Sequence, residues 1–218
     1  LFLDTINAAN PTPLLGEIEG TNPCGEQPLL PFEACVLGSI NLSKMVKLTH
    51  GEYEIDWNRL ETIIQLAVHF LDNVIDVNKY PLPQIEHLTR GNRKIGLGAM
   101  GLADLLIKFG ISYNSEEAIL FTDKLMCFLS QKANEASVKL AAKRCVFPNY
   151  QKSIYAQKNE PRYRNATRTT IAPTGTISII ADCSSGIEPL FAIAYKRHVL
   201  VEEGLPEINS FFLEIAKK

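Results

Sequence analysis

The chain has 218 residues, of which 46% are apolar and 21% are charged, and 22 Lys and Arg against 24 Asp and Glu give a formal net charge of −2. These values are ordinary for a globular protein and exclude a collagen, a coiled coil and a disordered chain. The near-zero charge also argues against a protein that mainly neutralises a nucleic-acid backbone, although single nucleotides remain candidate ligands.

Targeting and metal signals are scarce along the chain. The longest apolar stretch, 95–107, is shorter than a membrane span and carries Asp104, so we expect no membrane insertion. Because the chain starts without a Met or a basic leader, we expect a fragment of a longer protein. Five cysteines and four histidines at wide spacings lack a metal-ligand pattern, which predicts a reducing, cytoplasmic location and no protein-held metal ion.

The first half of the chain predicts turns followed by a helix. Residues 1–35 are dense in Pro and Gly, which favours short strands and loops. Apolar residues recur every three or four positions over residues 58–76, which predicts an amphipathic helix with Asn58 and Glu61 as a possible capping box. Pro81 follows the end of this helix.

The second half predicts two more helices and a strand. We expect helices over residues 98–109 and from Ser115 to Lys143, and a polar, basic surface segment over 152–168. The run 169–172 reads as a strand that Pro173 stops. Helices and strands therefore mix, which predicts an α/β protein, and we see no repeat or linker that would divide the chain.

The segment from Asn22 to Glu26 is the first candidate site. Pro23 favours an extended backbone, which would place the side chains of Asn22, Cys24 and Glu26 on one face. An amide, a thiol and a carboxylate together suit a site that holds hydroxyls, moves a proton and uses sulfur. A buried Cys in a Pro-rich turn remains an alternative. A hydrolytic Cys24 would need a histidine, and none lies within 25 residues.

Two glycine motifs are further candidates. Residues 173–176, Pro-Thr-Gly-Thr, could bind a phosphate if a helix begins there, although an ordinary turn is the alternative. Arg162, Arg164 and Arg168 could add positive potential, but we interpret most of them as a solvated face. Residues 96–101 match the spacing G-x-G-x-x-G of dinucleotide-binding folds, yet only Ile95 precedes them as a strand-like residue, so close packing explains the glycines as well.

Five motifs taken together are more specific than any single one. They occur in the order Thr21-Asn-Pro-Cys-Gly-Glu-Gln27, Glu33-Ala-Cys-Val-Leu-Gly-Ser-Ile-Asn-Leu42, Gly91-Asn-Arg-Lys-Ile-Gly-Leu-Gly-Ala-Met-Gly101, Arg164-Asn-Ala-Thr-Arg-Thr-Thr-Ile-Ala-Pro-Thr-Gly-Thr-Ile-Ser178 and Ser184-Ser-Gly-Ile-Glu-Pro189. In this order they resemble the catalytic subunit of ribonucleotide reductase over nearly the whole chain, from about residue 4 to 206.

The resemblance implies a fold and a reaction. The fold is a ten-stranded α/β barrel with a central finger loop, of which residues 1–218 would form a C-terminal portion as a single domain. Cys24 would become a thiyl radical that takes the 3′ hydrogen of a ribonucleotide, Glu26 would act as general base on the 3′ hydroxyl, and Asn22 would hold the sugar hydroxyls.

Other residues acquire roles through the same resemblance. Cys35 matches the family's reducing cysteine, whose disulfide partner would lie outside this chain. The loop Pro173, Thr174, Gly175, Thr176 and Ile177 matches the loop that takes the substrate phosphate. Cys127 and Cys145 are expected to be structural, and no role is predicted for Cys183.

The eleven-residue step from Cys24 to Cys35 resembles the adenosylcobalamin-dependent class II enzymes. That class implies adenosylcobalamin as cofactor and a thioredoxin-like dithiol as reductant. The complete protein would also take nucleotide effectors and could be a homodimer, and it would bind neither nucleic acid nor membrane. The alternatives are a class I enzyme with a separate radical-generating subunit, and a non-catalytic nucleotide-binding fragment or gene remnant. We expect the fragment alone to be inactive.

Overall fold

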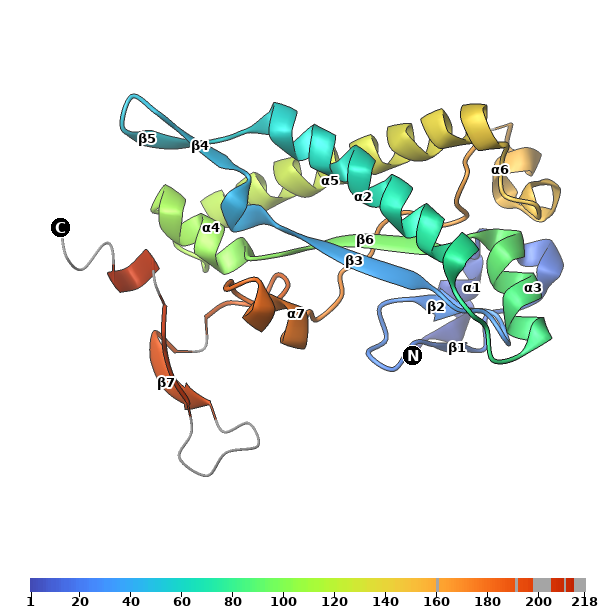
Figure 1. The fold of residues 1–218 in the computed structure, drawn as a ribbon, viewed down its shortest axis with the longest axis horizontal. Helices are drawn as coiled ribbons and strands as arrows, with labels where there is room; N and C mark the ends of the chain where they lie inside the picture. Colours follow the sequence, from blue (N-terminus) through green and yellow to red (C-terminus); the bar gives the residue numbers. More distant parts are fainter. Residues whose placement is uncertain (160, 191, 198–204, 210, 214–218) are drawn as a thin grey trace.

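The computed structural model describes residues 1–159, 161–190, 192–197, 205–209 and 211–213 (Figure 1). Helices and short strands both occur along the chain, with most strands before α2 and most helices after it. The helices are α1 (Leu3–Ala8), α2 (Trp57–Val77), α3 (Pro83–Asn92), α4 (Leu102–Phe109), α5 (Glu116–Arg144), α6 (Ile154–Gln157) and α7 (Gly175–Ile180). The strands are β1 (Gly20–Thr21), β2 (Pro28–Leu29), β3 (Val36–Asn41), β4 (Val46–Thr49), β5 (Glu52–Ile55), β6 (Ile95–Met100), β7 (Ala194–Arg197) and β8 (Leu205–Ile208).

Parallel strands form the centre of the fold. β3 and β6 pair in parallel from Val36 opposite Ile95 to Asn41 opposite Met100. A third stretch, residues 167–170, runs parallel to β6 on its other side: the Leu97 N–H donates to the Arg168 carbonyl over 2.8 Å, and the Thr170 N–H donates to the Leu97 carbonyl over 3.1 Å. The strand predicted at 169–172 thus begins earlier and pairs only briefly.

Helices connect these parallel stretches. The path from β3 to β6 contains the hairpin β4–β5 and then α2 and α3, and the path from β6 to residue 167 contains α4, α5 and α6. Parallel neighbours joined by helical crossovers are the hallmark of α/β proteins, so the predicted fold class is confirmed. The described residues contain no closed barrel.

The two longest helices cover one side of the strands (Figure 1). α2 and α5 contribute the largest part of the main hydrophobic core, together with the buried residues of β6. Ser115 caps α5 by accepting a hydrogen bond from the Ala118 N–H over 3.1 Å, so this helix starts where it was predicted. α2 begins one residue earlier than predicted and is capped by Asp56, whose carboxylate accepts from the Arg59 N–H, so the capping box at Asn58 was wrong.

The glycine motif at 96–101 lies in a strand, which corrects the helix predicted from residue 98. β6 contains Gly96 and Gly98, and α4 begins only after Gly101, which adopts a φ of 75°. A Cβ atom on Gly98 would lie 2.5 Å from the Thr170 carbonyl oxygen, so the close approach of two backbones requires glycine there. A dinucleotide-binding fingerprint needs its glycines in the turn after a strand, and these lie inside it.

The segment 152–168 is only partly at the surface: residues 152, 157–159 and 161–162 are exposed as predicted, whereas its aromatic residues and its last residues are buried or half-buried. Tyr155, Tyr163 and Ala166 pack with Phe147 and Tyr150 in a second hydrophobic cluster. The Arg168 guanidinium lies 4.1 Å from the centre of the Tyr163 ring. It also donates to the side-chain oxygen of Asn134 over 2.8 Å. The sequence pattern did not predict this cluster, because its aromatic residues are irregularly spaced and follow no helical periodicity.

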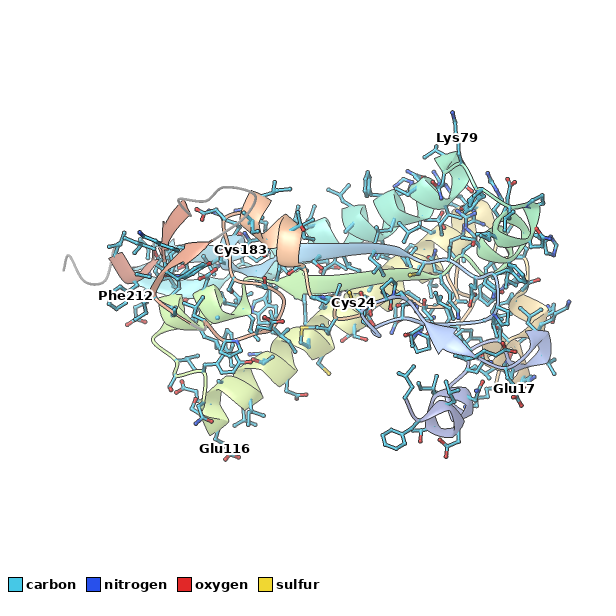
Figure 2. All side chains as sticks on the ribbon, turned by 90° about the horizontal axis from the view of Figure 1, so that it is seen from below. Glu17, Cys24, Lys79, Glu116, Cys183 and Phe212 are labelled. Carbon is cyan, nitrogen blue, oxygen red and sulfur yellow. The ribbon has the colours of Figure 1, made fainter. Side chains whose placement is uncertain are left out.

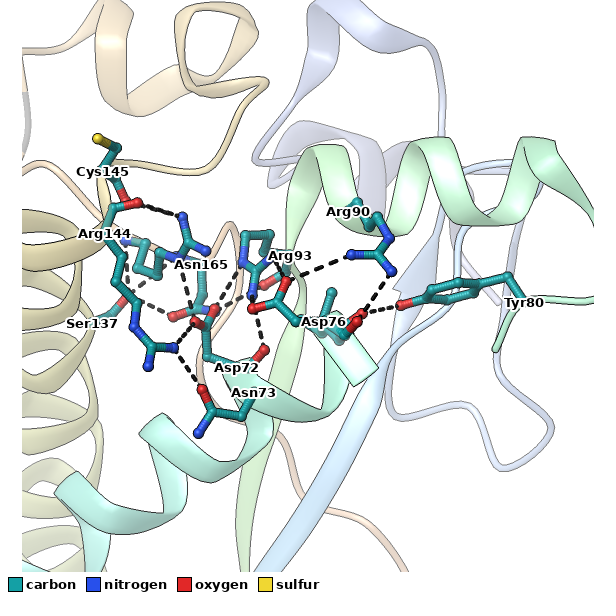
Figure 3. A network of polar contacts seen from close by, with 12 residues as sticks. Asp72, Asn73, Asp76, Tyr80, Arg90, Arg93, Ser137, Arg144, Cys145 and Asn165 are labelled. Carbon is teal, nitrogen blue, oxygen red and sulfur yellow. Dashed lines mark hydrogen bonds and ion pairs between the residues drawn. The ribbon is translucent and has the colours of Figure 1, made fainter. Parts of the chain in front are cut away.

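Asp72 of α2 is the centre of a buried polar network (Figure 3). Its carboxylate accepts from the Arg93 Nε over 2.8 Å, from the Asn165 amide over 3.0 Å and from the Arg164 Nε over 3.3 Å. Arg93 adopts a left-handed conformation with a φ of 50° at the end of α3. Arg93 and Arg164 therefore serve the packing of α2 against its neighbours, and Arg164 is no solvated basic side chain.

None of the helices in the described part of the chain combines the length and the apolar character needed to cross a membrane.

Candidate functional site

Residues 22–27 form the loop of a small hairpin. β1 and β2 pair antiparallel, with Thr21 opposite Pro28. The Asn22 N–H donates to the Gln27 carbonyl over 3.1 Å, and the Gly25 N–H donates to the Asn22 carbonyl over 3.1 Å. The second bond closes a turn in which Gly25 has a φ of 90°. The extended backbone predicted for 22–26 was therefore wrong, because local hydrogen bonds fold the loop back.

The three candidate side chains occupy different environments within this loop. The Asn22 amide oxygen accepts from the Gln27 N–H over 3.0 Å, so part of its capacity is used inside the hairpin. Cys24 lies exposed at the tip. Glu26 is half-buried, and its Oε2 atom is shielded from solvent without a hydrogen-bond partner in the described structure. A buried carboxylate oxygen without a partner is unusual and marks a place where a ligand hydroxyl could bind.

Two threonines fix the hairpin to the third parallel stretch. The Thr170 hydroxyl donates to the Glu26 carbonyl over 2.8 Å, and the Gln27 side-chain amide donates to the Thr167 hydroxyl over 3.0 Å. The hairpin lies on the side of β6 opposite α2 and α5 (Figure 1), and in the view from that side Cys24 projects over the middle of this strand (Figure 2). The sequence did not predict these two hydrogen bonds, because no local pattern indicates a contact between residues at least 140 positions apart.

Cys35 lies immediately before β3 and is half-buried. Burial raises the pKa of the Cys35 thiol to about 11, and the neighbouring carboxylates of Glu26 and Glu33 add to this increase. The influence of Glu26 means that the hairpin carboxylate and this thiol lie within electrostatic reach of each other. All five cysteines are free thiols, and those of Cys127 and Cys145 are exposed.

The loop 173–177 leads from the third parallel stretch into α7. Thr174 has a left-handed φ of 58°, and Gly175 is the first residue of this short helix. The motif at 184–189 packs against the loop: the Gly186 N–H donates to the Thr174 hydroxyl oxygen over 2.7 Å, and the hydroxyls of Ser178 and Ser185 lie 2.9 Å apart. A helix therefore does begin at Gly175, which is the condition on which the phosphate-binding interpretation of 173–176 depended.

This loop lies at the carboxyl ends of the parallel strands. The Asn41 amide donates to the Ala181 carbonyl over 3.4 Å, and the Gly101 N–H donates to the Ser184 carbonyl over 2.8 Å. Asn41 ends β3 and Gly101 follows β6. Ligands of α/β proteins bind at this edge of the sheet. The 167–170 stretch connects the thiol-bearing hairpin to this edge.

No group of three or more His, Cys, Asp or Glu side chains suited to a metal ion gathers among the described residues.

Fold and site together define an α/β protein whose parallel strands carry a hairpin with an exposed thiol and an unpartnered carboxylate. The family model for the ribonucleotide reductase barrel domain matches residues 1–161 and 159–218. The chain therefore belongs to the ribonucleotide reductase barrel-domain family.

Curated relatives agree with this assignment. A vitamin B12-dependent ribonucleoside-diphosphate reductase of Thermoplasma acidophilum is 55% identical over 98% of this chain and 27% of its own length. A protein of the same name from Mycobacterium tuberculosis is 52% identical over 100% of this chain and 30% of its own length. A ribonucleoside-diphosphate reductase subunit alpha of Chlamydia pneumoniae is 30% identical over 94% and 22%. The chain thus spans less than a third of these relatives.

Proposed function

We propose that the protein containing this chain reduces ribonucleotides to 2′-deoxyribonucleotides by thiyl-radical chemistry, with diphosphates as the substrate class that the relatives' names indicate. The observation that carries the proposal is the Glu26 carboxylate, whose buried Oε2 lacks a partner. It lies two residues from the exposed Cys24 thiol and within electrostatic reach of Cys35. The proposed reaction needs a base and two kinds of thiol, and these residues supply them.

Each of these residues has a defined step. The Cys24 sulfur, once it carries the radical, takes the 3′ hydrogen of the ribose, and Glu26 takes the proton of the 3′ hydroxyl. The 2′ hydroxyl then leaves as water. Cys35 and a partner cysteine supply two electrons and two protons by forming a disulfide, and the 3′ hydrogen returns from Cys24 to the sugar. The balance is ribonucleotide plus dithiol to deoxyribonucleotide, disulfide and water.

The protonation state of Cys35 supports this role. With a pKa raised to about 11, the side chain stays a thiol near neutral pH and can deliver hydrogen to the substrate. A thioredoxin-like dithiol would restore the thiol after each turnover. The partner cysteine of Cys35 belongs to a region outside this chain.

The remaining site elements form the substrate pocket in this proposal. The N–H groups of Gly175, Thr176 and Ile177 at the start of α7 face no intrahelical acceptor and would bind the substrate phosphate, together with the loop residues Pro173 and Thr174. The hairpin would be the finger loop of a ten-stranded barrel, and residues 1–218 its C-terminal portion as a single domain. The complete protein would be cytoplasmic, regulated by nucleotide effectors and homodimeric.

Adenosylcobalamin is the proposed cofactor, because the names of two relatives describe dependence on vitamin B12. The hairpin tip fits a bulky radical source: Cys24 is exposed, and a Cβ on Gly25 would meet nothing within 4 Å. When bound, this cofactor supplies a carbon radical through cleavage of its cobalt–carbon bond. Cys24 would receive that radical. No described residue is assigned as a cobalt ligand.

The test uses the complete reductase with the substitution Cys24→Ser. We expect turnover of ribonucleoside diphosphates to disappear while nucleotide affinity changes less than about twofold, because a hydroxyl holds hydrogen too strongly to exchange it with the sugar. Cys127→Ser, which removes an exposed thiol on α5, is the control and should retain full turnover. Substantial turnover by Cys24→Ser would refute the radical role.

A second arm addresses the source of the radical. The wild-type enzyme is assayed with and without adenosylcobalamin in the presence of a dithiol. Dependence on the cofactor supports the proposal, whereas activity that requires a separate protein subunit would place the enzyme with the class I reductases.

A further inference from the structure

Between Glu26 and Cys35 the chain makes a sharp turn with a buried ion pair at its base. The Lys94 ammonium lies 2.6 Å from Glu33 Oε2, and the two side chains are 1% and 0% exposed. Lys94 immediately precedes β6, and Glu33 lies two residues before Cys35. A buried ion pair seldom adds net stability, since its desolvation cost offsets much of the attraction, so its value here lies in the geometry that it imposes.

The ion pair holds the segment 28–33 at several points. The Lys94 ammonium also donates to the Pro28 carbonyl over 3.2 Å. The Leu30 N–H donates to Glu33 Oε2 over 2.9 Å, while the Glu33 N–H donates to the Leu30 carbonyl over 3.0 Å. These reciprocal bonds close a turn in which Phe32 has a left-handed φ of 62°.

Asn92 completes the arrangement from the end of α3. Its side-chain amide donates to Glu33 Oε1 over 2.7 Å, and its own oxygen accepts from the Asn149 amide over 2.9 Å. Both carboxylate oxygens of Glu33 are thereby bonded, and every donor comes from a segment that is itself anchored. The turn cannot shift without breaking several of these charge-assisted bonds.

We propose that the Lys94–Glu33 ion pair is a positioning clamp, which fixes the Cys35 thiol relative to the Glu26 carboxylate and sets the charge that surrounds this thiol. The clamp restrains Pro28, two residues after Glu26, and Glu33, two residues before Cys35. Both side chains are buried and act on the thiol only through the segments that they hold, so both are positioning residues. This inference rests on the proposed role of Cys35 as the reducing thiol.

The charged groups near Cys35 give the clamp a measurable signature. Glu26 and Glu33 raise the pKa of the thiol, and Lys94 lowers it. Removing the Glu33 charge should therefore lower the pH at which Cys35 becomes reactive, whereas removing the Lys94 charge should increase it. A general loosening of the fold would expose the thiol and lower that pH in both variants.

The experiment measures alkylation of Cys35 by iodoacetamide in the complete reductase between pH 7 and 11.5, located at this residue by mass spectrometry. Glu33→Gln should shift the midpoint downward, and Lys94→Met should shift it upward, each by about half a pH unit. Glu17→Gln and Lys158→Met, at exposed positions, are the matched controls and should leave the midpoint unchanged.

Two further results complete the test. If Lys94→Met does not fold, the comparison is between Glu33→Gln and the neutral double variant Glu33→Gln/Lys94→Met. The clamp predicts a lower alkylation midpoint for Glu33→Gln, because that variant keeps the Lys94 charge. In turnover, Glu33→Gln should lower kcat severalfold and leave KM for the ribonucleotide within about twofold, because the clamp serves the reducing thiol.

If the alkylation midpoints of Glu33→Gln and Lys94→Met shifted in the same direction, or did not shift, the proposed clamp would be wrong. Since alkylation needs no turnover, this outcome is separate from a failure of the radical mechanism, which Cys24→Ser tests.

Discussion

The hydroxyl of Thr170 donates a hydrogen bond of 2.8 Å to the carbonyl oxygen of Glu26. This bond joins the thiol-bearing hairpin to the third parallel stretch, 144 positions away in the sequence. It restrains the backbone of the residue that we propose as general base, so the position of the Glu26 carboxylate depends on a side chain that has no chemical role.

Substituting Thr170→Val tests this dependence. Valine keeps the branched shape and removes the donor, so we expect a loss of about 1 kcal/mol of stability and a severalfold decrease in kcat with little change in nucleotide affinity. Thr62→Val on α2 is the matched control, since the Thr62 hydroxyl also donates to a backbone carbonyl, that of Asn58, over 2.9 Å. Equal kcat values for the two variants would contradict the role of Thr170.

Gly175→Val tests the proposed phosphate loop. A Cβ on Gly175 would meet nothing within 4 Å, so the chain itself tolerates the larger side chain. If a phosphate approaches these N–H groups, the valine blocks it, and the affinity for the ribonucleotide should decrease about tenfold or more. Calorimetric titration checks the affinity and thermal unfolding checks the fold. An unchanged affinity would remove this loop from the site.

Gly98→Ala tests the close contact between β6 and the third stretch. The added methyl group would lie 2.5 Å from the Thr170 carbonyl oxygen, a backbone atom that cannot rotate away. We expect destabilisation of about 1–3 kcal/mol from this overpacking. Gly20→Ala is the control, because a Cβ there meets nothing within 4 Å. Urea unfolding compares the two, and equal midpoints would show that the strands can separate at no cost.

Acidification should weaken the network around α2 through Asp76. The hydrogen bond from Arg93 is the largest cause that holds the Asp76 pKa below its usual value of 3.8. A carboxylate with a lowered folded pKa stabilises the fold above its unfolded pKa, and this stability is lost as the pH falls through the folded pKa. The difference in unfolding temperature between wild type and Asp76→Asn should stay constant from pH 7 to about pH 5 and shrink below 3.8. A constant difference down to pH 2 would contradict it.

Sequence periodicity predicted the elements that local physics decides. The apolar spacing of α2 and α5 predicted both helices nearly in full, because an amphipathic face is encoded within one segment. At 173–176 the Pro, Gly and Thr residues left a helix start and an ordinary turn open, and the structure has the helix start.

Elements whose conformation depends on contacts with distant parts of the chain were not predicted. β6 contains two glycines and was predicted to start a helix, but it is a strand because β3 and the stretch 167–170 pair with it. α3 is mostly polar, and Pro83 at its first turn was its main local signal. The loop at 22–27 folds back through hydrogen bonds that its proline does not reveal. The roles proposed for Cys24, Glu26 and Cys35 rest on the ordered sequence motifs. The contacts and burial of these residues could be learned only from the fold.

Several segments of the chain converge on Asp72, and this restricts how they can unfold. Its carboxylate joins α2 to the end of α3, to α5 through Arg144 at 3.6 Å, and to the segment at 164–165. Because Asp72 is fully buried, each segment that leaves removes part of the compensation for its charge, which favours opening of the segments together. Amide protons near Asp72 and those near Asn165 should therefore exchange with deuterium through one shared opening, with the same opening free energy, although the two residues lie 93 positions apart in the sequence.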